Sequence, residues 1–248
     1  MERNRKFYSF LLIVFILVFF VKRLFFETSN KYIAPGMNTE PTPRTRQEEL
    51  DFLLKATKFA TERHELQKRK AHGGQTPYII HPVTVAEILS SAGVSDVEVL
   101  AGALLHDTIE DTNTTKEELE AAFGPRVTRI VLDCSDDKSL PWQVRKIKQI
   151  EHAPHMLPDS QLVKIADKIA NVEDILDNGS PWGAVRTQGY IAWAAEVVKG
   201  IPRAIPSLHE RFERAFTRSF RDPNGDVFPA VPADKTREQI LKEFLARV

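Results

Sequence analysis

The sequence predicts an all-α fold from residue 48 onward. Apolar residues recur there at the three- and four-residue spacing of an amphipathic helix, as Leu50, Leu53, Leu54 and Ala60 do in the first such segment. Residues typical of helix termini separate these segments, and no run alternates polar with apolar residues as a strand would. Successive helices joined by short connections indicate a helical bundle.

Glycines and capping residues set the expected helix ends. The first helix covers residues 48–64 and is followed by a loop at Gly73-Gly74, and the second ends at Gly93. Ser95 can cap the third helix, residues 96–111.

Further along the chain, Thr114 and Glu117 form a capping box for a helix that Gly124 ends. A second capping box, Thr236 with Gln239, predicts a short helix near the C-terminus. The remaining helices are expected at 125–134, 142–152, 159–176, 183–199 and 203–219.

The N-terminus differs from the rest of the chain. Residues 7–26 are apolar except for Tyr8, Ser9, Lys22 and Arg23, and the two cations could extend their charges to the membrane surface. A secretory signal peptide is the alternative, but no small-residue cleavage site follows. We therefore expect an N-terminal membrane segment. The expected division is an anchor at 1–26, a Pro- and Thr-rich linker at 27–47, a catalytic domain at 48–220 and a tail at 221–248.

Composition narrows the possible partners. The formal net charge is zero, so no basic excess indicates nucleic-acid binding, and we expect no such partner. Cys134, the single cysteine, excludes an intramolecular disulfide and is expected to be a buried thiol.

The strongest functional signal is the order His81, His106-Asp107, Asp167. A lone His-Asp pair is common by chance, but HDTIEDT places several ionisable groups directly after the apolar run LAGALL. Burying these groups without partners would be costly, and a bound cation removes that cost. Two imidazoles and two carboxylates suit a divalent first-row metal such as Mn²⁺. Zinc prefers more nitrogen or sulfur ligands, and Mg²⁺ rarely accepts imidazole.

Two further carboxylates follow the His-Asp pair by one helical turn. Glu110 is four residues after His106, and Asp111 is four residues after Asp107, so each shares a helical face with an expected ligand. Either carboxylate could orient or deprotonate an attacking water. Metal and acid/base groups together predict a hydrolase.

The same segments resemble a known family. The motifs HELQKRK, TPYIIHPVTVAEIL, LLHDTIEDTNTT, FGPRVTRIV, DDKSLP, KIADKIANVEDI and WAAEVVKG are similar to the HD-domain hydrolase of RelA/SpoT homologues, over roughly residues 48–215. The small, hydrolase-only branch typified by the metazoan SpoT homologue is the most similar. The resemblance implies hydrolysis of the 3′-diphosphate of (p)ppGpp, giving GDP or GTP and pyrophosphate, with Mn²⁺.

The resemblance also implies roles for individual residues. It makes His81, His106, Asp107 and Asp167 the metal ligands, and Glu110 with Asp111 the catalytic pair. The substrate contacts that it implies are Arg69, Lys70, Lys138, Lys164, Asn171, Arg186 and Tyr190. The chain departs from the family at Ala71, where an aspartate is usual, and at Glu173, where a basic residue is usual. Both departures concern the nucleotide side of the site.

Two other functions remain open at this point. The metazoan-type relatives suggest an NADPH 2′-phosphatase, which would place a ribose phosphate at the same metal. A nucleotide-binding protein without catalysis, tethered to a membrane through residues 7–26, is the other. The apolar stretch predicts a membrane-anchored protein, and because the family's nucleotides are cytosolic, the resemblance implies that its catalytic domain faces the cytosol. The charges that flank the apolar stretch nearly balance and predict no orientation.

Overall fold

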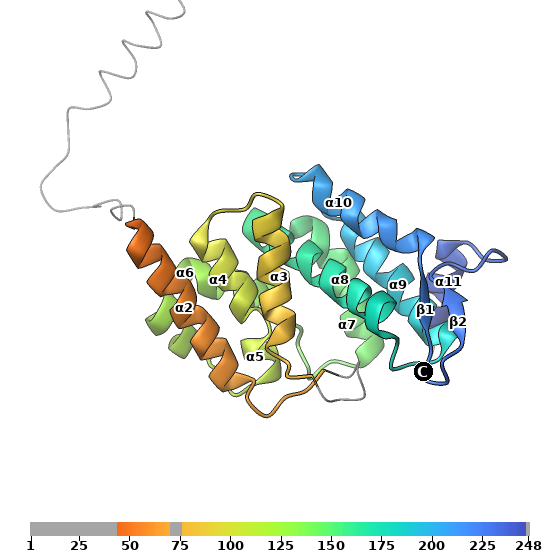
Figure 1. Ribbon diagram of the computed structural model, residues 1–248, viewed down its shortest axis with the longest axis horizontal. Coiled ribbons are helices and arrows are strands. Elements are labelled where there is room, and N and C mark those ends of the chain that lie inside the picture. The colour runs from red at the N-terminus through yellow and green to blue at the C-terminus, as the bar shows by residue number, and fades with distance from the viewer. Residues whose placement is uncertain (1–43, 70–75, 247–248) are drawn as a thin grey trace, which may run out of the picture. The chain divides into compact units, whose positions relative to one another are not determined.

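Helix α8, Pro158–Asn178, is central in the computed structural model (Figure 1). The structure describes residues 44–69 and 76–246. Ile165, Ala166 and Val172 on α8 are almost fully buried, as expected for a helix covered on several sides. The elements packed against α8 include α3 (Ile80–Ser91), α4 (Val97–Leu105), α6 (Lys116–Cys134), α9 (Ala184–Lys199), α10 (Pro206–Glu213) and strand β1 (Ser219–Arg221).

The other elements complete a mostly helical fold. They are α2 (Arg46–Arg63), α5 (Thr108–Asp111), α7 (Trp142–His152), the 3₁₀ turns η2 (Ala153–His155) and η3 (Arg214–Thr217), β2 (Val227–Pro229) and α11 (Arg237–Leu245). Helix α2 packs on α4, α4 packs on α6, and α7 and α11 pack on α9.

Buried apolar side chains form two clusters that meet along α4. The smaller cluster joins α2, α4 and α6 through Ala60, Leu105 and Phe123. The larger cluster surrounds α8 and includes Val99 and Ala103 from the opposite side of α4. Helix α4 therefore lies between the two clusters, and its C-terminal end is held firmly from both sides.

The helix caps differ from expectation by one residue at two places. Asp96, not Ser95, caps α4, and its carboxylate accepts from the amides of Glu98 and Val99. Thr115, not Thr114, caps α6. Asp96 also pairs with Arg126 at 2.8 Å, which favours the carboxylate over the neighbouring serine hydroxyl. The capping box expected at Thr236 is confirmed.

The segment expected to be one helix over 203–219 is divided. Helix α10 ends at Glu213, η3 follows, and β1 pairs antiparallel with β2 so that Phe220 lies opposite Phe228. Only three residues of β1 alternate between exposed and buried positions, and a run this short is not recognisable in the sequence. The absence of any strand was therefore a wrong expectation.

The structure also corrects the membrane prediction. Within residues 44–69 and 76–246, no helix has both the length and the apolar character needed to cross a membrane. The apolar stretch 7–26 and the segment 27–43 lie outside the described residues. The finding contradicts the expected fold class with a membrane segment and the expected membrane-anchored localisation, so neither prediction is retained.

Contact between α9 and α11 gives a test of the C-terminal packing. A Cβ added at Gly189 on α9 would lie 2.4 Å from Cδ2 and 2.7 Å from Cβ of Phe244 on α11. Gly189→Ala should therefore lower the free energy of unfolding by about 1–3 kcal/mol, because α11 must move. Gly183→Ala is the matched control, since no atom lies within 4 Å of its added Cβ. Urea unfolding measures both variants, and equal stability would contradict this packing.

Candidate metal centre and active site

His106 and Asp107 lie in a break between α4 and α5. The sequence suggested one continuous helix, but α4 ends at Leu105 and α5 begins at Thr108. Side chains close this break. The His106 ring shares a hydrogen bond with the Ala103 carbonyl through Nδ1 at 2.7 Å, and the Thr108 hydroxyl donates to the Leu105 carbonyl at 2.7 Å. Carbonyls left free at the end of α4 are thereby satisfied, and the motif residues are held in a fixed turn.

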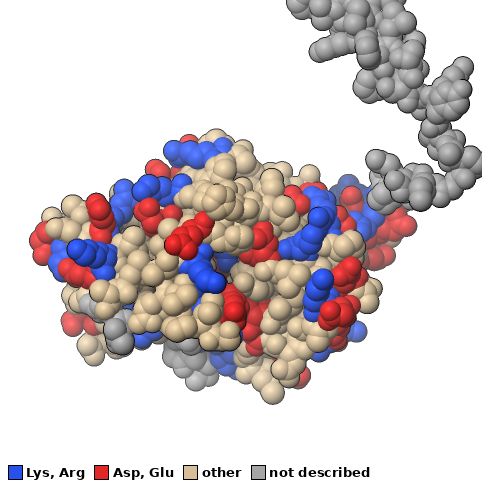
Figure 2. All heavy atoms as spheres, turned by 180° about the vertical axis from the view of Figure 1, so that it is seen from behind, with Lys and Arg blue, Asp and Glu red and all other residues tan. Residues whose placement is uncertain are grey.

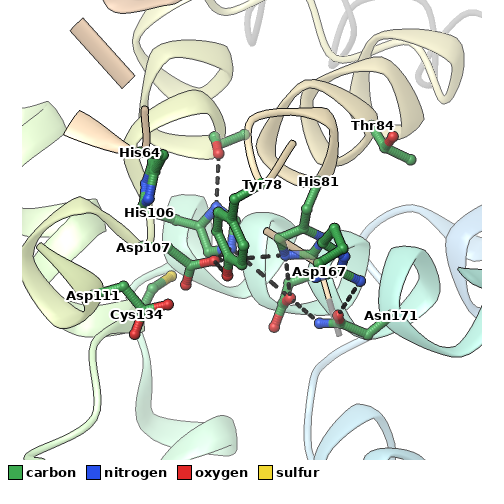
Figure 3. Close-up of polar contacts among 12 residues, drawn as sticks. His64, Tyr78, His81, Thr84, His106, Asp107, Asp111, Cys134, Asp167 and Asn171 are labelled. Atoms are coloured by element: carbon green, nitrogen blue, oxygen red, sulfur yellow. Dashed lines mark hydrogen bonds and ion pairs between the residues drawn. The ribbon is translucent and has the colours of Figure 1, made fainter. Parts of the chain in front are cut away.

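The four expected metal ligands lie together. Figure 3 shows His81 from α3, His106 and Asp107 from the break, and Asp167 from α8 pointing toward one another. His81 Nε2 lies 3.1 Å from Asp167 Oδ1 and 3.6 Å from Asp107 Oδ2. His106 Nε2 lies 3.1 Å from Asp107 Oδ2 and 3.8 Å from Asp167 Oδ1. His81, His106 and Asp167 each offer a ligand atom within 4.8 Å of the others, which is close enough to hold a divalent metal.

The second ring nitrogen of His106 is available as a ligand. Nδ1 is occupied by the Ala103 carbonyl, and a ring nitrogen facing a carbonyl carries the proton. Nε2 is buried and makes no hydrogen bond of acceptable geometry to a described residue, although Asp107 is near. With Nδ1 protonated, loss of the proton from Nε2 would leave a lone pair directed toward the two carboxylates. This arrangement fits a metal ligand.

The carboxylates create a strong local demand for positive charge. Burial alone would lower the pKa of His106, but the nearby negative charges of Asp107 and Asp167 raise it to about 10. Burial would raise the pKa of Asp107 and that of Asp167. Their cationic neighbours, led by His106 for Asp107 and by Lys168 for Asp167, instead hold both below the ordinary value. A divalent cation among these side chains would satisfy the same demand.

Three further side chains fix the carboxylates. The Tyr78 hydroxyl donates to Asp107 Oδ2 at 2.6 Å, and the Lys168 ammonium donates to Asp167 Oδ2 at 2.9 Å. The Asn171 amide donates to Asp167 Oδ1. Burial and the Asp107 charge raise the pKa of Tyr78 far above its ordinary range, so Tyr78 stays protonated and remains a donor. Sequence reasoning missed Tyr78 and Lys168, although each stands within one helical turn of a motif residue.

Glu110 and Asp111 on α5 have different environments. Glu110 Oε2 accepts from the Asp136 amide at 2.8 Å, and burial raises the pKa of Glu110 above its ordinary value. Asp111 forms an ion pair with Lys138. Its raised pKa makes Glu110 a stronger proton acceptor than an ordinary glutamate.

The residues expected to contact the nucleotide gather on the other side of Asp167. Arg69 Nη2 donates to Asp174 at 2.8 Å and to Asn171 Oδ1 at 3.0 Å, which links it to the Asp167 carboxylate through Asn171. Tyr190 packs between Trp182 and Trp193, and the Arg186 guanidinium lies 4.7 Å from the centre of the Trp182 ring. Aromatic rings and guanidinium groups in this arrangement can stack on a base. Lys70 lies outside the described residues.

The remaining expected residues lie toward the 134–138 segment. Lys138 is paired with Asp111, and the Lys164 ammonium donates to the Cys134 carbonyl at 2.8 Å. Glu173, which replaces a basic residue of the family, forms a double hydrogen bond with Arg211 at 2.7 and 2.9 Å. This replacement therefore joins α8 to α10 and does not point a carboxylate at the metal centre.

Comparisons with known proteins agree with this geometry. A family model described as an HD domain matches residues 56–188. The guanosine-3′,5′-bis(diphosphate) 3′-pyrophosphohydrolase MESH1 of Danio rerio is 49% identical over 167 residues, which cover 66% of this chain and 92% of the relative. The chain belongs to the HD-domain family of RelA/SpoT homologues. The same-named protein of Homo sapiens is 48% identical over 66% of this chain and 92% of its own.

A solved structure supports the family assignment at the level of the fold. It is described as a metazoan ortholog of SpoT that hydrolyzes ppGpp, and it superposes with a TM-score of 0.64 at 35% sequence identity. The superposition covers 71% of this chain and 96% of that chain. RelA/SpoT membership was predicted from sequence motifs, and that prediction is confirmed.

The geometry of the metal centre gives a direct test. Asp107→Ala should remove the bound divalent metal, because Asp107 lies within 3.6 Å of both imidazoles. Metal content measured by mass spectrometry after dialysis checks this. Asp226→Ala, at an exposed residue of the β1–β2 turn, is the control and should keep its metal. If the Asp107→Ala protein binds as much metal as the wild type, Asp107 is not a metal ligand.

Proposed function

We propose that this protein is a metal-dependent guanosine-3′,5′-bis(diphosphate) 3′-pyrophosphohydrolase that converts (p)ppGpp to GDP or GTP and pyrophosphate. The observation that supports it most is the buried cluster of His81, His106, Asp107 and Asp167, with the carboxylates of α5 following it by one turn. Relatives that carry this activity in their names align with most of their own length.

Four side chains of this chain would hold the metal. Two imidazoles and two carboxylates are a mixed nitrogen and oxygen set, which is the basis for proposing Mn²⁺ over Zn²⁺ or Mg²⁺. A divalent metal at this place supplies charge neutralisation at a phosphate and lowers the pKa of a water molecule.

The carboxylates of α5 would manage the proton of the attacking water. Water attacks the phosphorus bonded to the ribose 3′ oxygen, the bond between that phosphorus and the 3′ oxygen breaks, and pyrophosphate is released. Glu110 accepts the proton from water, and the ribose 3′ oxygen gains a proton as the nucleotide departs. The Asp136 amide holds Glu110 by its Oε2 atom, which leaves Oε1 for the water.

The aromatic and guanidinium groups beyond Asn171 would hold the nucleoside. Arg69 is fixed by Asp174 and Asn171, so its planar group is pre-organised for a base or a phosphate. The Tyr190 and Trp182 rings lie next to each other, with 5.4 Å between their centres. Helix α8 would then contact both the nucleotide, through Asn171, and the metal, through Asp167, because these residues lie one turn apart.

Turnover with product identification tests the proposal. The protein stripped of metal should be inactive on ppGpp, and added Mn²⁺ should restore release of GDP and pyrophosphate. NADPH is assayed under the same conditions, because a 2′-phosphatase would release inorganic phosphate from it. Hydrolysis of NADPH alone would replace the proposed function, and no metal-dependent turnover of either nucleotide would leave the non-catalytic hypothesis.

Substitutions of the carboxylates on α5 should separate metal binding from turnover. Glu110→Gln and Asp111→Asn keep the shape of the side chain but remove a proton acceptor, so each should retain metal while kcat falls by about 10²–10⁴-fold. Less than about tenfold loss in both variants would move the base elsewhere.

The pH profile of the intact enzyme provides a further test of Glu110. A base must be ionised, and burial raises the pKa of Glu110 above its ordinary value of 4.5. The value of kcat/KM should therefore fall as the pH drops through that raised pKa, and the acidic limb should be missing in Glu110→Gln. If Glu110→Gln kept the acidic limb of the kcat/KM profile, the group that titrates there would not be Glu110.

Changes on the nucleotide side should affect binding more than chemistry. Arg69→Ala and Tyr190→Ala should raise KM with a smaller effect on kcat, because Arg69 is hydrogen-bonded to Asn171 and Asp174 and Tyr190 packs between two tryptophan rings. An unchanged KM with a collapsed kcat would contradict the assignment of these residues to the nucleotide.

A further inference from the structure

Two lysine side chains meet over one buried indole behind the metal centre. The ring of Trp193 on α9 is 1% exposed. Lys146 Nζ from α7 lies 3.9 Å from the ring centre, and Lys168 Nζ from α8 lies 4.6 Å from it. The Trp193 indole donates to the Lys146 carbonyl at 2.9 Å, so α7 and α9 are fixed at this point. The packing of α7, α8 and α9 therefore brings the two ammonium groups close together.

The charges at this place are not balanced. Lys168 is compensated by Asp167. Lys164, one turn earlier on α8, is 6% exposed, and the hydrogen bond of its ammonium goes to the neutral Cys134 carbonyl. Within the described residues, neither Lys146 nor Lys164 forms an ion pair. Elsewhere Lys and Arg alternate with Asp and Glu over the surface, as Figure 2 shows for one face. A buried ammonium without a counter-charge is costly, so an anion would be stabilised beside these two lysines.

The electrostatics of Lys146 agree with this picture. Burial and then the positive charge of Lys168 lower the pKa of Lys146 to about 7. The other charged groups that act on it are Lys164, which also lowers the pKa, and Asp136 and Glu110, which raise it. Groups from α5, α8 and the 135–141 segment therefore all face Lys146. An anion bound nearby would raise its pKa again and restore its charge.

The order of residues along α8 relates these lysines to the metal centre. Lys164, Asp167, Asn171 and Asp174 recur at three- and four-residue spacing and so share one face of the helix. Arg69 binds at the Asn171 and Asp174 end, where aromatic rings suit a base. Lys164 lies at the opposite end, beside a cavity of about 470 Å³. Its other charged lining residues are Arg145 and Lys148 and the carboxylates of Asp133, Asp136, Asp137 and Glu151. The metal centre separates an aromatic end from a lysine end.

We propose that Lys146 and Lys164 bind the terminal phosphate of the diphosphate that is hydrolysed, which makes Lys146 a substrate-positioning residue. This inference rests on the proposed function. With the attacked phosphorus at the metal and the nucleoside toward Arg69, the terminal phosphate extends toward Lys164. The same two lysines would then hold the product pyrophosphate before its release.

The experiment measures binding of inorganic pyrophosphate and of GDP to the metal-loaded protein by calorimetry, together with KM and kcat for ppGpp. Lys146→Met keeps the aliphatic stem over Trp193 and removes the charge. It should weaken pyrophosphate binding and raise KM by about tenfold or more, with GDP binding and kcat changed by less than about threefold. Lys146→Arg should restore most of the affinity. Lys199→Met, at a side chain that is 75% exposed on α9, is the matched control and should equal the wild type.

A pH series separates positioning from packing. Wild-type affinity for pyrophosphate should fall more steeply than that of Lys146→Arg as pH rises through about 7, because only the lysine loses its proton there. The melting temperature of Lys146→Met should not fall, since the substitution removes repulsion from Lys168. Unchanged pyrophosphate affinity in Lys146→Met, or identical pH profiles for the two proteins, overturns the inference.

The outcomes distinguish this inference from the proposed function. If the wild type fails to hydrolyse ppGpp, the proposed function falls, and the pyrophosphate measurements still judge the lysines. If the wild type hydrolyses ppGpp and Lys146→Met binds pyrophosphate as tightly as before, the proposed function stands and the role of Lys146 is rejected. A lower melting temperature with unaltered affinity would assign Lys146 to packing alone.

Discussion

The confinement of two carboxylates, Asp107 and Asp167, with two imidazoles inside the helical core is the constraint on which the site depends. Buried like charges repel one another and lose hydration, so the arrangement requires positive charge at its centre. His106 supplies it as a proton when no metal is bound, which is why the carboxylates raise its pKa to about 10. A divalent metal would supply the charge without a proton and would leave His106 neutral. Metal binding would then be coupled to the stability of this part of the core.

The rest of the fold holds the side chains of that centre in fixed positions. The break after α4 is closed by side chains of the motif itself, so His106 is both a candidate ligand and the residue that satisfies the helix end. Two apolar clusters hold α4 from opposite sides, and α8 carries Asp167 through the larger one. Tyr78 and Lys168 then fix one oxygen of each carboxylate. Each of these two carboxylates is thereby oriented by a group that is not an expected ligand, which is how proteins tune metal sites.

Sequence patterns predicted the helices because helix formation depends on local spacing and residue type. They also named four candidate ligands, His81, His106, Asp107 and Asp167, which the structure brings together. The bounds of α7 and the capping box at Thr236 agree with expectation, whereas β1 was missed because three residues are too few to show alternation. Tyr78 could not be assigned in advance, since its contact with Asp107 joins segments 29 residues apart. Lys146 lies in a helix that the sequence predicted, but only the packing of α7 on α9 brings it to Trp193 and Lys168. Contacts of this kind depend on tertiary structure, which residue spacing does not encode.

Charged and polar side chains follow one another in a defined order along helix α8. From its N-terminal side, α8 presents an uncompensated lysine, then a carboxylate that faces the imidazoles, then an amide that connects to Arg69. A linear anion lying along this face would meet a cation, a metal and a guanidinium in turn, about one helical turn apart. Guanosine bis(diphosphate) carries one diphosphate on its 3′ ribose oxygen and one on its 5′ ribose oxygen, and its base is attached to the ribose between them. In the proposed binding mode, the difference between the aromatic rings near Arg69 and the ammonium group of Lys164 would give the substrate a direction, because a reversed nucleotide would leave the rings unused.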